Sequence, residues 1–296
     1  YPAGSGKRVA MTLFISSTLN GFALGAMLFL LASGFTLIYG LMRILNLAHG
    51  GIFLWGGYLT VTLTALTGNY LLGLVAAAVV IAVGGLGWER LFVRRVQGDV
   101  LGEVLLTVAF ALILADLGLV LWGGNPRAVG TPESLRGTVE VLGAPVPWFR
   151  VVVVVTAVVV MAAFWYVWQR TKVGAMIRAC VDDREMVRAL GIDTQRVYQG
   201  VWLAGLVLTA VAGSFGAVLM SMFPGLDFQV LVLALIVVVI GGLGNVWGAA
   251  IGSLVVGLCW TYSTVYVPEL LYFILFLPML LVLVFRPQGL LGARAR

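Results

Sequence analysis

Residues 151–168, VVVVVTAVVVMAAFWYVW, decide the fold class of this chain. The run carries no charged residue and approaches the roughly 20 residues with which an α-helix crosses about 30 Å of hydrocarbon. Its apolar residues do not alternate with polar ones, as they would in a strand of a membrane barrel. A membrane segment must satisfy its backbone hydrogen bonds internally, so the run predicts a transmembrane α-helix.

The whole chain is as apolar as this run suggests. Of its 296 residues 61% are hydrophobic and 10% are charged, and the mean hydropathy is +1.09, whereas soluble domains contain roughly 45–50% apolar residues. We therefore expect an all-α, polytopic transmembrane helical bundle that forms one domain over residues 1–296, with about eight or nine spans. The predicted spans cover about 11–40, 51–67, 70–88, 104–122, 150–168, 199–220, 229–243, 246–264 and 270–285.

Two glycine-rich stretches interrupt these apolar runs. The run from Met11 to Gly40 is long for one straight span and predicts a tilt, a kink or a break. The following stretch, LMRILNLAHGGIFLWGGY (41–58), predicts a broken or re-entrant helix. Its part NLAHGGIFLWGG (46–57) has a counterpart in GGLGNVWGAAIG (241–252), since each combines an Asn, paired glycines and a Trp. Such corresponding interruptions indicate pseudo-repeated halves with a translocation site between them. Close helix packing through small residues is the alternative interpretation.

After the run at 151–168 comes a polar segment, QRTKVGAMIRACVDDREMVRALGIDTQRVY (169–198), with six basic and four acidic residues. Asp182 is typical of a helix N-cap, with Asp183 next to it and Glu185 completing a capping box. Gly191 is typical of the residue that follows a helix. We therefore expect a helix of about two turns over DREMVRAL. This helix would dock either on a protein partner or on the membrane interface.

The basic residues indicate how the bundle is oriented. Three arginines lie in 89–103, six basic residues in the polar segment and three arginines after residue 285, whereas the loop 123–149 holds two. Because positive charge is enriched on the cytoplasmic side, we expect the polar segment and the C-terminus in the cytoplasm. Since these charges lie at the ends of apolar runs, we exclude a nucleic-acid partner and expect contact with membrane lipid.

Catalytic and metal-binding chemistry has little support in the sequence. The chain has one histidine, His49, and two cysteines, Cys180 and Cys259, without the spacing of metal ligands or of a disulfide framework. No nucleophile, base and acid are spaced as a catalytic triad. We therefore expect a protein without catalytic residues, without a metal site and without a cofactor of its own.

Four stretches together resemble one known family. They are NGFALGAMLFLLASGFTLIYGLMRILNLAHGGIFLWGGY (20–58), GAMIRACVDDREMVRALGIDTQRVY (174–198), GGLGNVWGAAIGSLVVGL (241–258) and FRPQGLLG (285–292). They resemble the LivH-type permeases of the branched-chain amino-acid ABC transporters. The resemblance extends over nearly the whole chain.

This resemblance implies a multi-pass subunit of the bacterial inner membrane. Its partners would be a homologous LivM-type permease subunit, with which it forms a heterodimer, two cytoplasmic ABC ATPases and a periplasmic or extracellular solute-binding protein. ATP and magnesium would bind to the ATPases. The polar segment would be the coupling segment that an ATPase grips. The coupling residues are Asp182, Asp183, Glu185, Met186, Arg188, Ala189, Leu190 and Gly191.

Polar residues inside the predicted spans are the candidates for the substrate path. A polar group in hydrocarbon is costly unless it is paired, so it usually faces the bundle interior or a water-filled cavity. For Asp116 we expect structural pairing before a proton relay. For the others an interhelical hydrogen bond without substrate contact is the alternative. The candidates are Asn20, Asn46, His49, Asp116 and Asn245.

The sequence therefore predicts an ATP-driven importer subunit that works by alternating access. Its substrates would be branched-chain or other small, largely apolar amino acids. The alternatives are a gradient-driven secondary transporter that uses Asp116 and His49, a permease for urea or short amides, and an intramembrane enzyme or a structural scaffold.

Overall fold

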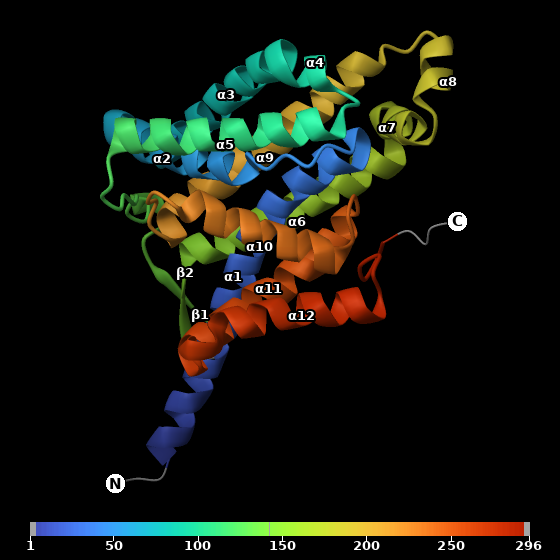
Figure 1. The fold of residues 1–296 in the computed structure, drawn as a ribbon. Helices are drawn as coiled ribbons and strands as arrows, with labels where there is room; N and C mark the ends of the chain where they lie inside the picture. Colours follow the sequence, from blue (N-terminus) through green and yellow to red (C-terminus); the bar gives the residue numbers. More distant parts are fainter. Residues whose placement is uncertain (1–3, 142, 293–296) are drawn as a thin grey trace.

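The computed structural model describes residues 4–141 and 143–292, and most of them are helical (Figure 1). The long helices are α1 (Gly4–Met42), α2 (His49–Thr67), α3 (Tyr70–Trp88), α5 (Val100–Trp122), α6 (Trp148–Arg170), α9 (Thr194–Leu219), α10 (Leu226–Gly241), α11 (Val246–Tyr266) and α12 (Leu271–Phe285). Short elements connect them: a π-turn (Glu89–Val93), α4 (Arg94–Val96), α7 (Lys172–Asp182), α8 (Arg184–Ala189) and 3-10 turns at Glu133–Leu135 and Pro268–Leu270. An antiparallel hairpin of β1 (Thr138–Val141) and β2 (Ala144–Pro147) precedes α6.

The helices confirm the prediction of a polytopic helical membrane protein. Within the described residues, eight helices are long and apolar enough to cross a membrane, and α10 is a shorter apolar helix. Most of the predicted bounds agree with the structure within a few residues. The larger differences are at two helix starts: α1 begins at Gly4 instead of near Met11, and α9 begins at Thr194 instead of near residue 199. Asp193 caps α9 by accepting hydrogen bonds from the backbone N–H groups of Gln195 and Arg196.

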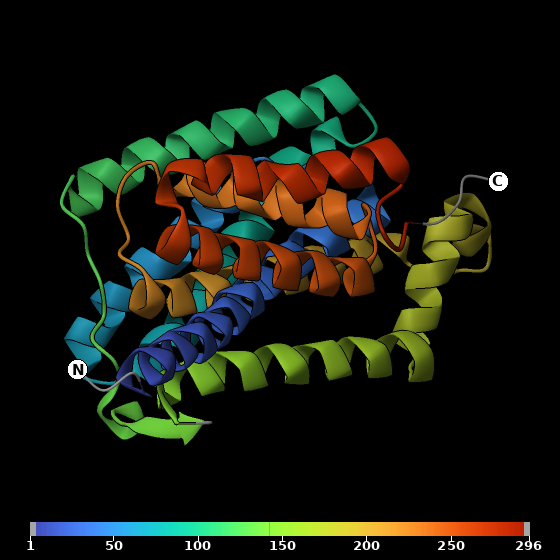
Figure 2. The same ribbon diagram turned by 90° about the horizontal axis from the view of Figure 1, so that it is seen from below.

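Helix α1 is one continuous helix that runs obliquely across the bundle (Figures 1 and 2). Its glycines are contact points with other helices. A Cβ on Gly25 would lie 2.9 Å from the carbonyl oxygen of Ser253 in α11, and a Cβ on Gly34 would lie 2.5 Å from that of Gly205 in α9. The small residues therefore let α1 pack closely on two neighbours without a break in the helix.

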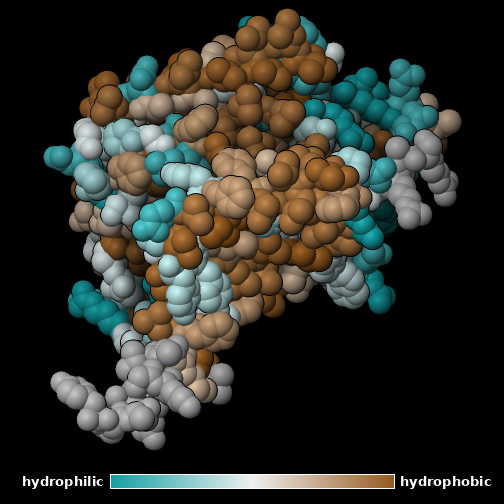
Figure 3. Space-filling view, turned by 60° about the horizontal axis from the view of Figure 1, so that its bottom comes forward, coloured by the Kyte–Doolittle hydropathy of each residue, from teal (hydrophilic) through white to brown (hydrophobic). Residues whose placement is uncertain are grey.

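The bundle has a buried interior and an apolar outer layer. Helices α1 and α9 are mostly buried, whereas most residues of α3, α5, α6 and α12 are partly or fully exposed. Figure 3 shows hydrophobic residues over much of the visible face, and hydrophilic residues gather at the end that carries α7 and α8. This distribution is the one expected when lipid surrounds the bundle.

The two ends of the bundle carry different elements. The N-terminal end of α1 and the loop 123–147 lie at one end, and α7, α8 and the C-terminal tail lie at the other (Figure 2). The loop is fixed to the bundle by paired backbone hydrogen bonds between Arg127 and Met222. Two of the arginines that entered the orientation argument, Arg294 and Arg296, lie outside the described residues.

Candidate functional site

The chain between α1 and α2 forms a re-entrant interruption, as the sequence predicted. Helix α1 ends at Met42, and Arg43 adopts a left-handed backbone conformation with φ of 59°. Residues 43–48 then run without helical structure back into the bundle, where Asn46 and Ala48 are buried. The Thr107 hydroxyl donates a hydrogen bond to the Leu45 carbonyl at 3.3 Å. We call residues 43–48 the first interruption.

His49 shows how deep this interruption reaches. Its Nε2 lies 3.0 Å from the carbonyl oxygen of Leu31 and 2.7 Å from Oγ1 of Thr209, and its ring packs edge-on against Phe35. Leu31 precedes the end of α1 by eleven residues, which corresponds to about 16 Å of helix. Helix α2 therefore begins inside the bundle and not at its end.

The contacts of His49 also determine its tautomer. The Leu31 carbonyl can only accept a hydrogen bond, so Nε2 of His49 carries the proton and donates it. The hydroxyl of Thr209 donates to the Gly205 carbonyl and is thus free to accept from the same N–H. Nδ1 of His49 is then a buried acceptor, and neither it nor Nδ2 of Asn46 has a hydrogen-bond partner among the residues that the structure describes.

The second re-entrant segment is not the one that the sequence suggested. Helix α9 ends at Leu219, and residues 220–225 turn back before α10 begins. A Cβ on Gly50 in α2 would lie 2.0 Å from the carbonyl oxygen of Asp227, so the starts of α2 and α10 touch. The two helices then run toward opposite ends of the bundle. Residues 220–225 are therefore the structural counterpart of the first interruption.

The predicted counterpart, 241–252, contains a tight turn near one end of the bundle. We call residues 242–245 the glycine turn. Gly242 and Gly244 have φ values of 103° and 81°, and Leu243 is 46% exposed. Asn245 caps α11 by accepting from the backbone of Trp247 and Gly248. The prediction that 241–252 is the counterpart of 46–57 was wrong, because the glycine turn lies near one end of the bundle and the first interruption lies inside it. Short glycine motifs serve helix contacts and positive-φ turns equally well, so the shared pattern does not fix the depth of either stretch.

The C-terminal tail completes this turn. The backbone N–H groups of Leu290 and Leu291 donate to the carbonyls of Ile240 and Gly241, the last residues of α10. The side-chain amide of Asn245 donates to the Leu291 carbonyl at 2.6 Å. The tail thereby satisfies backbone groups that a helix end leaves unpaired.

The candidates for the substrate path do not form one cluster. Asn46 and His49 lie together at the start of α2, whereas Asn245 is at the glycine turn. Asn20 is partly buried in the part of α1 that packs beside α11. Asp116 is exposed on α5 and makes no hydrogen bond or ion pair with the described residues. Within this chain, only the first two share a site.

The contacts that hydroxyl groups make around the start of α2 could not be recognised from the sequence. Thr209 bonds His49, and further along the same helix pair the hydroxyls of Thr60 and Ser214 lie 2.7 Å apart. Each of these hydroxyl oxygens also lies within hydrogen-bond distance of the carbonyl four residues earlier in its own helix. A single Ser or Thr in an apolar run satisfies itself in this way in any span, so the pattern gave no signal of a contact between helices.

The polar segment forms two helices instead of the expected one. Helix α7 ends at Asp182, so Asp183 is the N-cap of α8, and it accepts hydrogen bonds from the backbone N–H groups of Glu185 and Met186. This corrects the assignment of Asp182, and Glu185 becomes the second helical residue instead of the third. Gly191 follows α8 with φ of 80°, as predicted.

Helix α8 turns one apolar side inward and another outward. Val187 is buried in a small core with Ile177, Cys180 and Tyr198, and Leu41 near the end of α1 belongs to the same core. The outward side includes Arg188, Ala189, Met186 at 58% exposure and Leu190 at 72%. Burial of Cys180 raises the pKa of its thiol, and the nearby Arg184 lowers that pKa to a smaller extent.

The end of α1 therefore connects the polar segment with the first interruption and with the glycine turn. Leu41 packs against the polar segment, and Arg43 begins the first interruption. On the same end of α1, a Cβ on Gly40 would lie 3.4 Å from the Cα of Gly244 in the glycine turn. A displacement of the polar segment would reach both turns through this part of α1.

Comparison with known proteins agrees with this architecture. A family model described as the permease component of the branched-chain amino acid transport system matches residues 17–283. The permease BraD of Pseudomonas aeruginosa is 26% identical, over 94% of this chain and 96% of its own length. LivH of Escherichia coli K12 is 29% identical over the same shares of the two chains.

More distant similarity extends to another class of importer. The ribose import permease RbsC of Escherichia coli K12 is 26% identical over 77% of this chain and 71% of its own length. No solved structure matches the chain. Among residues 4–141 and 143–292, no group of three or more His, Cys, Asp or Glu side chains is placed to hold a metal ion. The match over residues 17–283 establishes that the chain belongs to the family of branched-chain amino acid transport permease components.

Proposed function

We propose that this chain is the permease subunit of an ATP-driven importer for branched-chain or other small, largely apolar amino acids. It is one transmembrane domain, and residues 169–198 are its cytoplasmic coupling segment. It sits in the bacterial inner membrane with its C-terminus in the cytoplasm. Its partners are a LivM-type permease subunit, two ABC ATPases and a solute-binding protein. This chain binds no cofactor itself, and ATP and magnesium bind to the ATPases.

The observation that carries the proposal is the two-sided packing of α8. Val187 fixes the helix to the bundle, while Met186 and Leu190 leave an apolar side exposed beside charged residues. Such apolar side chains at helical spacing suit a groove on a protein partner. Because the core beneath α8 includes Leu41, a partner that moves α8 would also move the end of α1.

The start of α2 supplies groups for the solute. Among the residues that the structure describes, Nδ1 of His49 is an acceptor without a donor and Nδ2 of Asn46 is a donor without an acceptor. An amino acid carries a donor ammonium and an acceptor carboxylate. When the bundle opens there, its ammonium could donate to His49 and its carboxylate could accept from Asn46. A buried polar group without a partner costs about 1–3 kcal/mol, which favours a state in which a solute satisfies it.

Transport by the purified complex tests the proposal. The complex recovered through this chain is placed in liposomes with its binding protein and radiolabelled leucine. We expect uptake that requires ATP and that unlabelled isoleucine and valine inhibit. Uptake sustained by a proton or sodium gradient without ATP would support the secondary transporter instead. Inhibition by urea or acetamide, but not by isoleucine, would assign the chain to amides.

A matched pair of variants tests the docking surface. Leu190→Asp places a charge on the exposed side of α8, and Leu66→Asp places the same charge on an equally exposed residue in the last turn of α2. We expect the first to reduce recovery of the ATPases about tenfold or more, since a charge in an apolar groove remains unpaired. The second should leave recovery unchanged. Equal recovery with both variants contradicts docking through α8.

A further inference from the structure

Glu89 is a buried carboxylate at the place where α3 ends. The residue is 1% exposed, and it begins a π-turn in which the backbone N–H of Arg94 donates to its carbonyl. Single π-turns within helices occur frequently at functional sites. A buried charge is unfavourable unless it is paired and hydrogen-bonded, so the groups around this carboxylate need an explanation.

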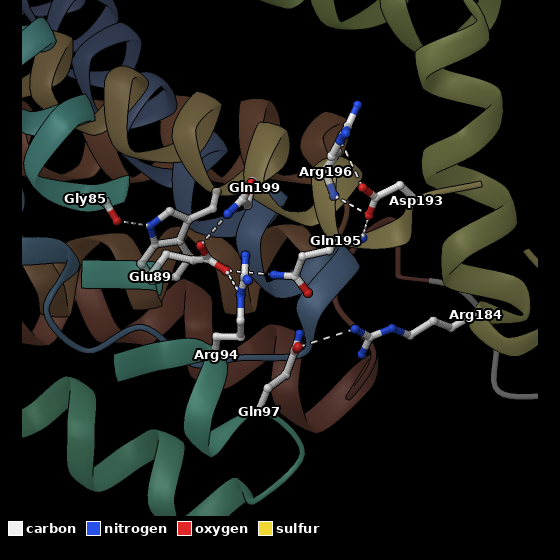
Figure 4. A network of polar contacts seen from close by, with 10 residues as sticks. Gly85, Glu89, Arg94, Gln97, Arg184, Asp193, Gln195, Arg196 and Gln199 are labelled. Atoms are coloured by element: carbon white, nitrogen blue, oxygen red, sulfur yellow. Dashed lines mark hydrogen bonds and ion pairs between the residues drawn. The ribbon is translucent and has the colours of Figure 1, made fainter. Parts of the chain in front are cut away.

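Three side chains surround the carboxylate (Figure 4). The amides of Gln195 and Gln199 donate to its two oxygens, each at 2.9 Å. Nε of Arg94 lies 3.6 Å from Oε1. The two glutamines are four residues apart on the first two turns of α9, so they share one side of that helix. Glu89 thereby ties α9 to α3 at the start of α9.

The same two turns of α9 hold the polar segment on another side. The Arg188 side chain of α8 donates to the Thr194 hydroxyl at 3.1 Å. The guanidinium of Arg184 lies over the ring of Tyr198, 4.4 Å from its centre. Thr194 and Tyr198 are again four residues apart. The start of α9 therefore lies between α8 and Glu89 and contacts both.

Packing alone does not require an acid at this position. One turn further along the pair, the indole N–H of Trp202 donates to the Gly85 carbonyl. A Cβ on Gly85 would meet the side chain of Leu206. Small and apolar residues thus bring α3 and α9 together there without any buried charge. The carboxylate adds a directional constraint, because charge-assisted hydrogen bonds are stronger than neutral ones.

We propose that Glu89 is a positioning residue for transport: it holds the start of α9 against α3, so that a displacement of α8 passes to the α3–α5 hairpin. This role rests on the proposed function, because it assumes that a partner moves α8. Without the carboxylate, the start of α9 would move with α8 but separate from α3. The displacement that the partner imposes on α8 would then be transmitted less completely to the other helices.

The test uses the intact complex and four variants. Glu89→Leu removes both acceptors at similar volume, and Glu89→Gln removes the charge alone. The double variant Glu89→Gln with Gln195→Glu returns a carboxylate to the same contact. Glu133→Gln is the control, since its side chain is 87% exposed in the loop 123–147. The readouts are ATP hydrolysed per leucine taken up and hydrogen exchange of the amides at 194–199.

We expect Glu89→Leu to raise the ATP hydrolysed per leucine about tenfold and to speed exchange at 194–199 by a similar factor, because two charge-assisted hydrogen bonds are lost. Glu89→Gln should lie between this variant and the wild type, and the double variant should recover. A merely structural role predicts fewer assembled complexes with an unchanged ratio of ATP to leucine, which would overturn the proposal.

Exchange separates this proposal from the proposed function. Unchanged exchange at 194–199 in Glu89→Leu overturns the positioning role whatever the transport result. Wild-type complexes that take up no leucine with ATP contradict the importer instead, and exchange in the purified chain still decides whether Glu89 holds α9.

Discussion

The stretches 46–57 and 241–252 share an Asn, paired glycines and a Trp, but the first interruption (43–48) and the glycine turn (242–245), which overlap them, differ in the structure. The first interruption returns into the bundle, where Asn46 and Ala48 are buried, and Asn46 and the adjoining His49 keep polar groups without partners among the described residues. The glycine turn lies near one end of the bundle, and the tail pairs with the carbonyls of Ile240 and Gly241 beside it. Two unpaired polar groups therefore lie at the first interruption and the start of α2, whereas the glycine turn is a completed structural element.

The glycines of 46–57 and 241–252 also have different roles. Gly50, just after the first interruption, is needed because the backbone of α10 approaches it closely. Gly242 is needed chiefly because its φ of 103° disfavours a side chain. The same residue type thus records an approach between two helices in one region and a backbone conformation in the other.

Gly50→Val should have the largest effect of the changes that probe this comparison. Its Cβ would lie 2.0 Å from the carbonyl oxygen of Asp227, so α2 and α10 would have to separate. We expect a loss of more than about 3 kcal/mol and little folded protein. Gly87→Ala is the control, since its Cβ meets no atom within 4 Å. Size-exclusion chromatography and thermal unfolding in detergent measure both, and equal yields would contradict the contact.

Gly242→Ala should be less severe. The substitution strains a positive-φ position and brings a Cβ to 2.8 Å from the backbone nitrogen of Gly292 in the tail. We expect about 1–3 kcal/mol of destabilisation and earlier cleavage of the tail by protease, while the wild-type tail stays protected. A tail that remains equally protected in Gly242→Ala would show that it does not depend on the glycine turn.

The two asparagines sharpen the comparison further. Asn245→Ala removes an N-cap and the donor to the Leu291 carbonyl, so we expect about 1 kcal/mol of destabilisation with leucine uptake per folded complex unchanged. Asn46→Ala removes the acceptor for the Ala48 N–H and the unpaired amide. We expect a similar loss of stability and a several-fold rise in KM for uptake. An unchanged KM would leave Asn46 with a structural role alone.

The sequence was sufficient to predict the spans and the first interruption, because long apolar runs and a cluster of Arg, Asn, His and Gly are local signals. It could not show that 220–225 is the counterpart. That segment, MSMFPG, contains Pro224 and Gly225 as its strongest turn residues, and its depth follows from packing of α10 against Gly50. Pairing of distant segments is decided by tertiary contacts that no local pattern records.

Single capping residues and buried acids could not be identified from the sequence either. Asp182 and Asp183 are chemically identical N-cap candidates, and only the end of α7 at Asp182 decides between them. Glu89 looked like an ordinary acid of an arginine-rich loop. Its burial depends on Gln195 and Gln199, more than 100 residues later in the chain, so its role becomes visible only when α3 and α9 are placed side by side.

The smallest of the expected effects is a difference in thiol reactivity. It measures how well the end of α1 and the glycine turn are shielded from solvent. Cys180 lies in the core that covers the end of α1 before the first interruption, and burial raises its pKa. A raised thiol pKa stabilises the folded state while the thiol is protonated, below the unfolded value of about 8.5, and this contribution is lost as pH rises through the folded value.

In a Cys259→Ser background, N-ethylmaleimide should therefore react with Cys180 several-fold more slowly at pH 8 than with the chain unfolded in detergent. A cysteine introduced by Leu243→Cys at the exposed glycine turn, with Cys180→Ser, should react at nearly the unfolded rate. Equal rates at the two positions would show that the core around Cys180 does not cover the end of α1 more tightly than the tail covers the glycine turn.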